Sequence, residues 1–134
     1  MAMQEAPEGL AALTALVARL RGQGGCPWDQ RQTPESLLKY LREECEELVC
    51  AVQSGDQAAV REESGDLLFV LTFLIRLYEE QDAFSWQEVC ADAQAKMVRR
   101  HPHVFGDSRA SSEAELKQQW AEIKAAEKRA RQKP

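Results

Sequence analysis

Apolar residues recur every three or four positions over most of the chain, which is the spacing of one face of an α-helix. In the first such stretch, residues 8–21, the apolar positions are Leu10, Leu13, Leu16, Val17 and Leu20. No segment alternates convincingly between apolar and polar residues, as a half-buried β-strand would. The pattern therefore predicts an all-α fold of about five helices.

Residue types that favour helix ends mark the boundaries of the first three helices. The glycine-rich segment 22–25 ends the first helix. Thr33 followed by Pro34 is an N-cap and first-turn pair, which predicts a second helix that runs to about residue 53. Asp56 can cap a third helix, which runs to about residue 81 and is the longest and most apolar of the set.

Two capping boxes open the last two helices. Ser85 and Ser112 are each followed three residues later by a glutamate, an arrangement that satisfies the free N–H groups at a helix start. The helices they open are predicted to end near residues 99 and 129. The segments 26–29 and 101–107 are predicted to be loops.

The composition is that of one foldable domain. The chain has 134 residues, of which 44% are hydrophobic and 29% charged, so we expect a single domain over residues 1–134 with a core at about 8–130. No apolar run approaches the roughly 20 residues that span a bilayer, and the start of the chain lacks the pattern of a secretory leader. The four cysteines contain no C-x-x-C pair. These features predict a cytoplasmic protein with reduced thiols and no membrane partner.

Acidic and basic residues are segregated along the chain. The net charge is −5, but residues 41–66 contain eight acidic and two basic side chains, whereas residues 96–134 contain five acidic and ten basic ones. This distribution suits a metal site and a polyanion site as well as ordinary solvation. The overall acidity argues against general nucleic-acid binding.

Two pairs of acids at i, i+3 conflict with the apolar faces of their helices. On a helical projection of the second helix, Glu44 falls inside the apolar stripe and Glu47 at its edge, and in the third helix Glu63 and Asp66 lie on the apolar side. Burying ionised carboxylates without compensation costs several kcal/mol per ion. Mg²⁺ or Mn²⁺ would supply the compensating charge through oxygen ligands. The alternative is that both acid runs are solvated helix faces, as such runs usually are.

The sequence resembles the MazG family of nucleoside triphosphate pyrophosphohydrolases. The resemblance covers about residues 10–130 and is carried by six motifs in order: Gly25-Cys-Pro-Trp-Asp29, Gln32-Thr33, Glu43-Glu44-x-x-Glu47, Glu63-x-Gly-Asp66-Leu-Leu-Phe69, Arg99-Arg-His-Pro-His-Val-Phe-Gly106 and Trp120-x-x-Ile-Lys124. It implies an all-α NTP pyrophosphatase fold. It also implies Mg²⁺-dependent hydrolysis of an NTP to NMP and pyrophosphate, with the ligands Glu44, Glu47, Glu63 and Asp66.

Other residues each have a possible role in this reaction and a simpler structural explanation. Glu43 could orient or deprotonate the attacking water, or could belong to a solvated face. Basic residues at the end of the fourth helix could grip the triphosphate or simply offset the helix dipole; these are Lys96, Arg99 and Arg100. Trp28 and Trp120 could stack on a base or pack in the core. His101 and His103 are assigned no ligand role.

The sequence also bears on base specificity and on the oligomeric state. Asparagine is absent from the chain, and few other polar groups flank the acids, so we expect broad base tolerance. Residues 67–78 are apolar on nearly all sides, which predicts a homodimer or a dimer of dimers, and the resemblance implies the same. The alternatives are a house-cleaning pyrophosphatase specific for one (d)NTP or an oxidised nucleotide, and a catalytically inactive helical dimerisation module.

Overall fold

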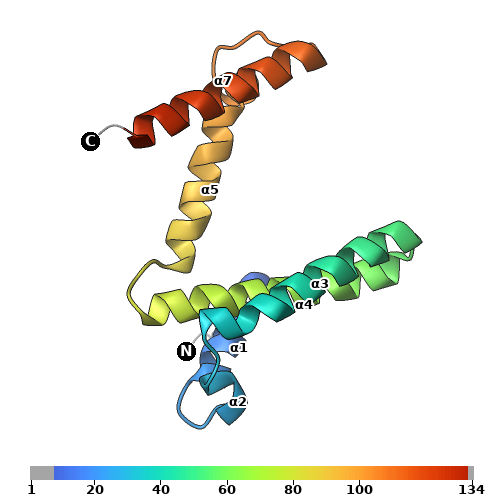
Figure 1. Cartoon of the computed structure of the whole chain (residues 1–134), viewed down its shortest axis with the longest axis vertical. Helices are drawn as coiled ribbons and strands as arrows, with labels where there is room; N and C mark the ends of the chain where they lie inside the picture. Colours follow the sequence, from blue (N-terminus) through green and yellow to red (C-terminus); the bar gives the residue numbers. More distant parts are fainter. Residues whose placement is uncertain (1–7, 133–134) are drawn as a thin grey trace, which may run out of the picture. The chain divides into compact units, whose positions relative to one another are not determined.

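The structure is a computed structural model, and it describes residues 8–132 (Figure 1). All regular elements in this range are helices: α1 (Gly9–Arg21), α2 (Pro27–Gln30), α3 (Pro34–Ser54), α4 (Gln57–Glu80), α5 (Trp86–Arg100), α6 (Pro102–Phe105) and α7 (Glu113–Gln132). The all-α prediction is confirmed. The two ends of the predicted domain, 1–7 and 133–134, lie outside the described residues.

The segments that were predicted to be loops each contain a helix of four residues, α2 and α6. Pro27 and Pro102 begin these helices. Proline suits the first helical position because its fixed φ is helical and its missing N–H would have no partner there. The described part of the chain therefore has seven helices, of which the five long ones match the predicted five.

Side-chain caps start three of the long helices at the predicted residues. The Thr33 and Ser36 side chains each accept the other residue's backbone N–H, at 3.2 and 2.9 Å. The Asp56 carboxylate accepts from the N–H groups of Ala58 and Ala59 at 3.0 and 3.3 Å. Ser112 Oγ accepts from Glu115 N at 3.1 Å. These bonds satisfy orphan donors at the helix starts and so fix where each helix begins.

The chain divides into two compact units, residues 1–86 and 87–134. In the first unit α3 and α4 run side by side as a helical hairpin, with α1 packed on α4 (Figure 1). The buried core of this unit joins these three helices; its members are Val17, Leu37, Phe73 and Leu77, with Tyr40, Phe69 and Leu74 packed against them. The core holds α3 and α4 in a fixed register.

A tight turn connects the two hairpin helices. Gly55 has φ = 75°, a left-handed conformation in which glycine avoids the steric cost of a Cβ atom. Its N–H donates to Val52 O at 3.2 Å. The turn places the last turns of α3 next to the first turns of α4.

Arg21 anchors the segment around α2 to the rest of the first unit. Its Nη1 donates to the carbonyl oxygens of Asp29 at 2.7 Å and Gln32 at 3.3 Å. Its Nη2 lies 2.9 Å from the Glu80 carboxylate at the end of α4. One largely buried guanidinium therefore fixes the backbone of residues 29–32.

The second unit contains most of α5, together with α6 and α7. Its main polar contact between helices joins the end of α5 to Glu127 of α7. A further contact links Ser108 Oγ to Gln119 Oε1. Among residues 8–132, no helix is long and apolar enough to cross a membrane.

Candidate metal centre and adjoining pocket

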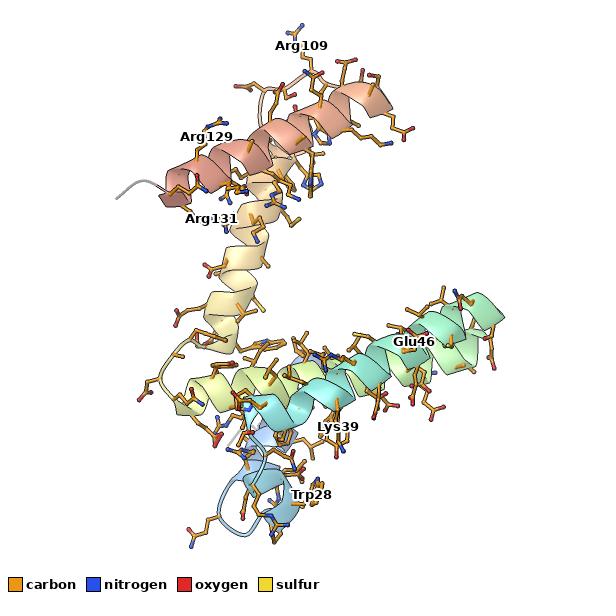
Figure 2. All side chains as sticks on the ribbon, in the orientation of Figure 1. Trp28, Lys39, Glu46, Arg109, Arg129 and Arg131 are labelled. Carbon is orange, nitrogen blue, oxygen red and sulfur yellow. The ribbon has the colours of Figure 1, made fainter. Side chains whose placement is uncertain are left out.

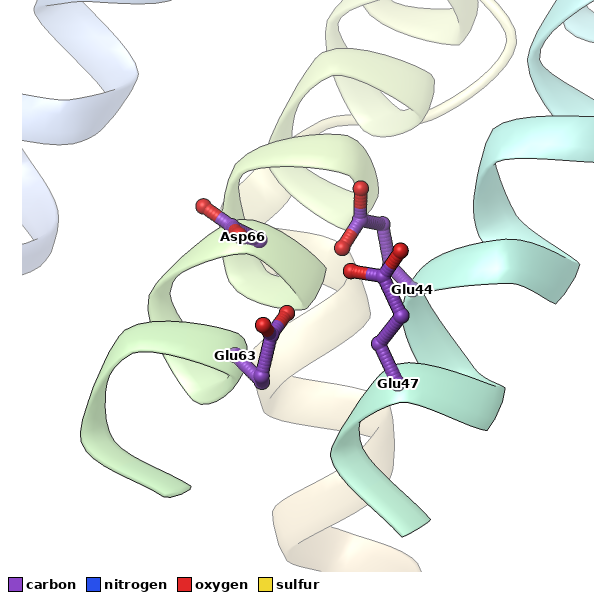
Figure 3. A group of neighbouring side chains, drawn as sticks. All are labelled: Glu44, Glu47, Glu63 and Asp66. Atoms are coloured by element: carbon purple, nitrogen blue, oxygen red, sulfur yellow. The ribbon is translucent and has the colours of Figure 1, made fainter. Parts of the chain in front are cut away.

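Four acids of the α3–α4 hairpin converge on one point (Figure 3). Glu44 and Glu47 lie one turn apart on α3, and Glu63 and Asp66 lie one turn apart on α4. One carboxylate oxygen from each of the four lies within 4.8 Å of the others. Because both pairs have i, i+3 spacing, each presents two carboxylates on one helix face. The structure brings together the four acids that the sequence singled out.

The charge of the acid cluster is not balanced by a basic side chain of the described residues. Among residues 8–132, no lysine or arginine forms an ion pair with any of the four acids. Glu44 Oε2 and Glu63 Oε2 are buried and have no hydrogen-bond partner in the described part of the chain. Unpaired buried oxygens are costly, and a donor set made only of carboxylates is the chemistry that hard divalent cations such as Mg²⁺ and Mn²⁺ prefer. These residues therefore fit a divalent metal ion.

Burial, together with the neighbouring carboxylates, raises the pKa of two acids of the cluster. Burial is the main cause of the raised pKa of Glu44, followed by the negative charges of Glu47 and Asp66. Burial, a hydrogen bond with Glu47 and the neighbouring negative charges raise the pKa of Glu63 to about 7. Without a cation, the cluster therefore binds a proton near neutral pH.

Glu43 precedes the first ligand candidate, and its side chain is exposed. Its charge contributes to the raised pKa of Glu44, so it acts on the cluster electrostatically. The exposure is compatible with contact to water and equally with a solvated helix face. A role for Glu43 in catalysis stays a prediction.

A pocket of about 310 Å³ adjoins the acid cluster within the first unit. Glu44 and Asp66 line it on the side of the cluster, and its apolar wall consists of Trp28, Leu37, Phe69, Val70 and Phe73. Trp28 is 57% exposed and extends from α2 (Figure 2), so it is not a core residue. The pocket offers flat apolar surface beside the carboxylates.

The predicted phosphate-contacting residues belong to the second unit. Arg99 Nε and Arg100 Nη2 lie 2.7 and 2.8 Å from the two carboxylate oxygens of Glu127. Lys96 is exposed and lines a groove of about 590 Å³ together with Arg99 and Arg131. Two of the three basic residues are therefore already paired within this unit.

Trp120 is half-buried in the second unit. The Arg100 guanidinium lies 5.1 Å from the centre of its ring, and the His101 ring packs edge-on against it at 5.4 Å. A cation over an indole face is a favourable contact. Trp120 therefore orients Arg100, and its predicted contact with a base stays a prediction.

Sequence reasoning assigned no role to three residues that the structure makes prominent. Asp29 and Gln32 line the pocket beside the acids, although both stand in the motifs that carry the family resemblance. Glu127 is the partner of Arg99 and Arg100. Its position two helical turns after Trp120, on the same face, is the signal that could have identified it.

A helical hairpin that gathers four carboxylates beside an aromatic pocket defines an all-α protein with a candidate acidic metal centre. The chain belongs to the MazG nucleotide pyrophosphohydrolase family. The family model described as "MazG nucleotide pyrophosphohydrolase domain" matches residues 32–105, which include all four acids.

Individual relatives agree with this assignment. The chain is 41% identical, over 94% of its length, to the "Nucleoside triphosphate pyrophosphohydrolase/pyrophosphatase MazG" of Thermotoga maritima, of which it covers 48%. It is 38% identical over 87% of its length to the "Nucleoside triphosphate pyrophosphohydrolase" of Escherichia coli K12, of which it covers 44%. The chain thus spans about half the length of these relatives. A crystal structure of a mazG-related protein from Thermotoga maritima matches with a TM-score of 0.71 and 26% identity, over 84% of this chain and 96% of that one.

Proposed function

We propose that the protein hydrolyses nucleoside triphosphates to nucleoside monophosphates and pyrophosphate, and that the reaction requires Mg²⁺, or Mn²⁺ in its place. The observation that carries this proposal is the convergence of four carboxylates, with carboxylate oxygens within 4.8 Å of one another and no Lys or Arg ion-pair partner among residues 8–132, beside an aromatic pocket. Membership of the MazG family and the names of the relatives support it.

Glu44, Glu47, Glu63 and Asp66 would hold the metal. When bound, the ion supplies positive charge that activates water and stabilises the charge that develops on the phosphates. Glu43, exposed beside the cluster, orients or deprotonates the attacking water. The pocket wall beside Trp28 receives the nucleoside, because Trp28 offers an exposed ring next to two of the acids.

The basic residues of the second unit contact the phosphates in this proposal. Lys96, Arg99 and Arg100 supply charge that is common to the recognition of every nucleotide, and Trp120 supports Arg100 through its ring. Because these contacts ignore the base, several ribo- and deoxyribonucleotides should be substrates. The family match crosses the boundary between the two units, which supports one MazG-like domain.

We propose that the active protein is a homodimer or a dimer of dimers. In the single chain, apolar side chains of the hairpin are exposed, among them Leu68 at 39%, Leu71 at 41% and Val52 at 60%. A groove of about 450 Å³ between α3 and α4 is lined almost entirely by apolar side chains, including Leu48, Val49 and Leu67. A second copy of the chain would cover these surfaces. A cytoplasmic location follows from the substrate, since nucleoside triphosphates are held there.

Release of pyrophosphate measured with Mg²⁺, over four NTPs and four dNTPs, tests the proposal. The proposal is supported if several nucleotides are hydrolysed and their kcat/KM values differ by no more than a factor of a few tens. Preference for one nucleotide by about 10⁴ would instead indicate a dedicated house-cleaning enzyme. Absence of release from any nucleotide, with a dimer in solution, would indicate an inactive dimerisation module.

A further inference from the structure

The pocket beside the acid cluster contains polar side chains as well as its apolar wall. The Gln32 amide is already engaged, because its Nε2 donates to Trp28 O at 3.1 Å and its Oε1 accepts from Ser36 Oγ at 2.7 Å. Tyr40 also lines the pocket, but a hydroxyl can donate or accept and so distinguishes bases poorly. Apart from the metal-centre acids, two lining side chains have a fixed hydrogen-bond character: the Trp28 indole N–H only donates, and the ionised Asp29 carboxylate only accepts.

The backbone of Asp29 is held, while its carboxylate has no partner in the range 8–132. Arg21 Nη1 donates to the Asp29 carbonyl oxygen at 2.7 Å, and the N–H of Gln32 donates to the same oxygen at 3.3 Å. In the part of the chain that the structure describes, no hydrogen bond or ion pair engages the Asp29 carboxylate, and it makes no capping bond in α2. Asp29 lines the pocket beside Trp28, which is exposed. No polar contact among residues 8–132 accounts for this carboxylate.

We propose that Asp29 reads the edge of the nucleobase that enters this pocket, and that it favours guanine nucleotides over uracil nucleotides. This inference rests on the proposed function and names its preferred substrate class. An ionised carboxylate only accepts hydrogen bonds. Guanine presents two adjacent donors on its Watson–Crick edge, N1–H and N2–H, which one carboxylate can accept together. Such a paired contact is both strong and geometrically specific.

The other bases match a carboxylate less well. Adenine and cytosine each offer an exocyclic amino donor beside a ring nitrogen that is an acceptor, so one carboxylate oxygen faces a lone pair. Uracil and thymine offer a single N3–H between two carbonyl oxygens, which repel the carboxylate on both sides. A paired contact of this kind is worth about tenfold or more in discrimination. We therefore expect guanine first, adenine and cytosine next, and uracil and thymine last, with all of them still hydrolysed.

The experiment compares GTP, ITP and UTP with the unaltered protein and with Asp29→Asn. ITP lacks only the N2 amino group of guanine, so the unaltered protein should prefer GTP over ITP and UTP by about tenfold in kcat/KM. Asparagine presents one donor and one acceptor, which match O4 and N3–H of uracil. Asp29→Asn should therefore lower the GTP-to-UTP ratio at least tenfold and remove the preference for GTP over ITP.

Glu35→Gln is the matched control, since it removes the same charge from an exposed position in the first turn of α3 that does not line the pocket. It should leave all three ratios unchanged. If Asp29→Asn lowers the activity on all three nucleotides equally, the residue has a structural or ribose-binding role and the inference is wrong. Equal use of GTP and ITP by the unaltered protein overturns it without any variant.

Calorimetric binding of GMP, IMP and UMP in the presence of Mg²⁺ separates this inference from the proposed function. If no triphosphate is hydrolysed, the proposed function fails. The role of Asp29 is still supported in that case if the protein binds GMP about tenfold more tightly than IMP and UMP and Asp29→Asn abolishes this preference. Hydrolysis with no difference between the bases, in turnover and in binding, overturns the role of Asp29 and leaves the proposed function standing.

Discussion

Arg100 Nη2 lies 2.8 Å from Glu127 Oε2, and the two side chains are only 11% and 12% exposed. Arg99 Nε contacts the other oxygen of the same carboxylate at 2.7 Å. Hydrogen bonds from Arg100 and then from Arg99 lower the pKa of Glu127 to about 2. One acid on α7 therefore holds two of the basic residues that we propose to contact phosphate.

Glu127 should make the second unit sensitive to acid. Its ionised form is stabilised only in the folded protein, so this contribution to stability is complete above the ordinary glutamate pKa of about 4.5 and is lost as the pH falls through about 2. We expect Glu127→Gln to lower the melting temperature at pH 6 and to reduce its dependence on pH between 5 and 2.5. Thermal unfolding followed by circular dichroism measures both. Glu122→Gln, on the same helix, is the control, and an equal change in that variant would contradict the assignment.

Lys96 tests phosphate binding without disturbing this ion-pair network. It is exposed, and among the ion pairs of residues 8–132 those of Glu127 are with Arg99 and Arg100 and not with Lys96. Lys96→Ala should raise KM severalfold for every nucleotide alike, because it removes a contact to phosphate and none to the base. Lys128→Ala, an exposed lysine of α7, serves as the control in the same steady-state assay. A change confined to one nucleotide would mean that Lys96 contacts the base.

Removal of a single carboxylate from the cluster should abolish turnover. In Glu44→Gln and Asp66→Asn the donor set loses one anionic ligand, and pyrophosphate release should fall by about 10² or more, with the helical circular dichroism signal unchanged. Glu62→Gln changes an exposed acid of α4 that lies outside the cluster, and it should retain activity. Undiminished turnover in either cluster variant, or full activity of the unaltered protein in excess EDTA, would refute the metal assignment.

The raised pKa of Glu63 predicts how the metal-free protein responds to pH. A carboxyl group that binds its proton more tightly when folded contributes stability below its ordinary pKa of about 4.5, and this is lost as the pH rises through about 7. The melting temperature in EDTA should therefore fall between pH 5 and 7.5. Mg²⁺ should restore it at pH 7.5, since the ion binds the folded cluster. Glu63→Gln should flatten the pH dependence in EDTA; a dependence that persists in this variant would assign it to other groups.

Assembly can be tested on the exposed apolar face of the hairpin. Sedimentation at micromolar concentration should give a dimer or a tetramer of the 15.1 kDa chain. Leu71→Glu places a charge at a leucine that is 41% exposed in the single chain, and it should shift the protein toward monomer without loss of helical signal. Leu16→Glu, at a 47% exposed leucine of α1, is the control. A monomer for the unaltered protein would refute the proposal.

The parts of the site that depend on local periodicity could be predicted from the sequence. Glu44 and Glu47 were placed by their angular position within one helix, as were Glu63 and Asp66 within the next, and a short turn between two long helices leaves few ways to pair them. The limits of α3 and α4 followed from Thr33 and Asp56, whose side chains act within three residues of themselves.

Contacts between distant residues could not be predicted in this way. Arg21 meets Glu80 across 59 positions, and Arg99 meets Glu127 across 28, and no periodic pattern links such pairs. The helices α2 and α6 have four residues each, which is too short to show a 3.6-residue repeat. The sequence also gives no sign that the Asp29 carboxylate lacks a partner among residues 8–132. The structure shows this, because Arg21 contacts the Asp29 backbone and the Gln32 side chain bonds to Trp28 and Ser36.

The relative orientation of the two acid pairs depends on the number of helical residues between Glu47 and Glu63. Only residues 55 and 56 separate the two helices, and each residue added to a helix rotates the rest of that helix by about 100°. Inserting one residue into α4 after Val60 would carry Glu63 and Asp66 away from Glu44 and Glu47 although all four acids remained in the sequence. An insertion of seven residues into α4 before Glu63, close to two full turns, would restore their direction but displace them by about 10 Å along the axis. The deletion or insertion of a single helical residue between Glu47 and Glu63 should therefore disable the protein as thoroughly as the loss of a carboxylate.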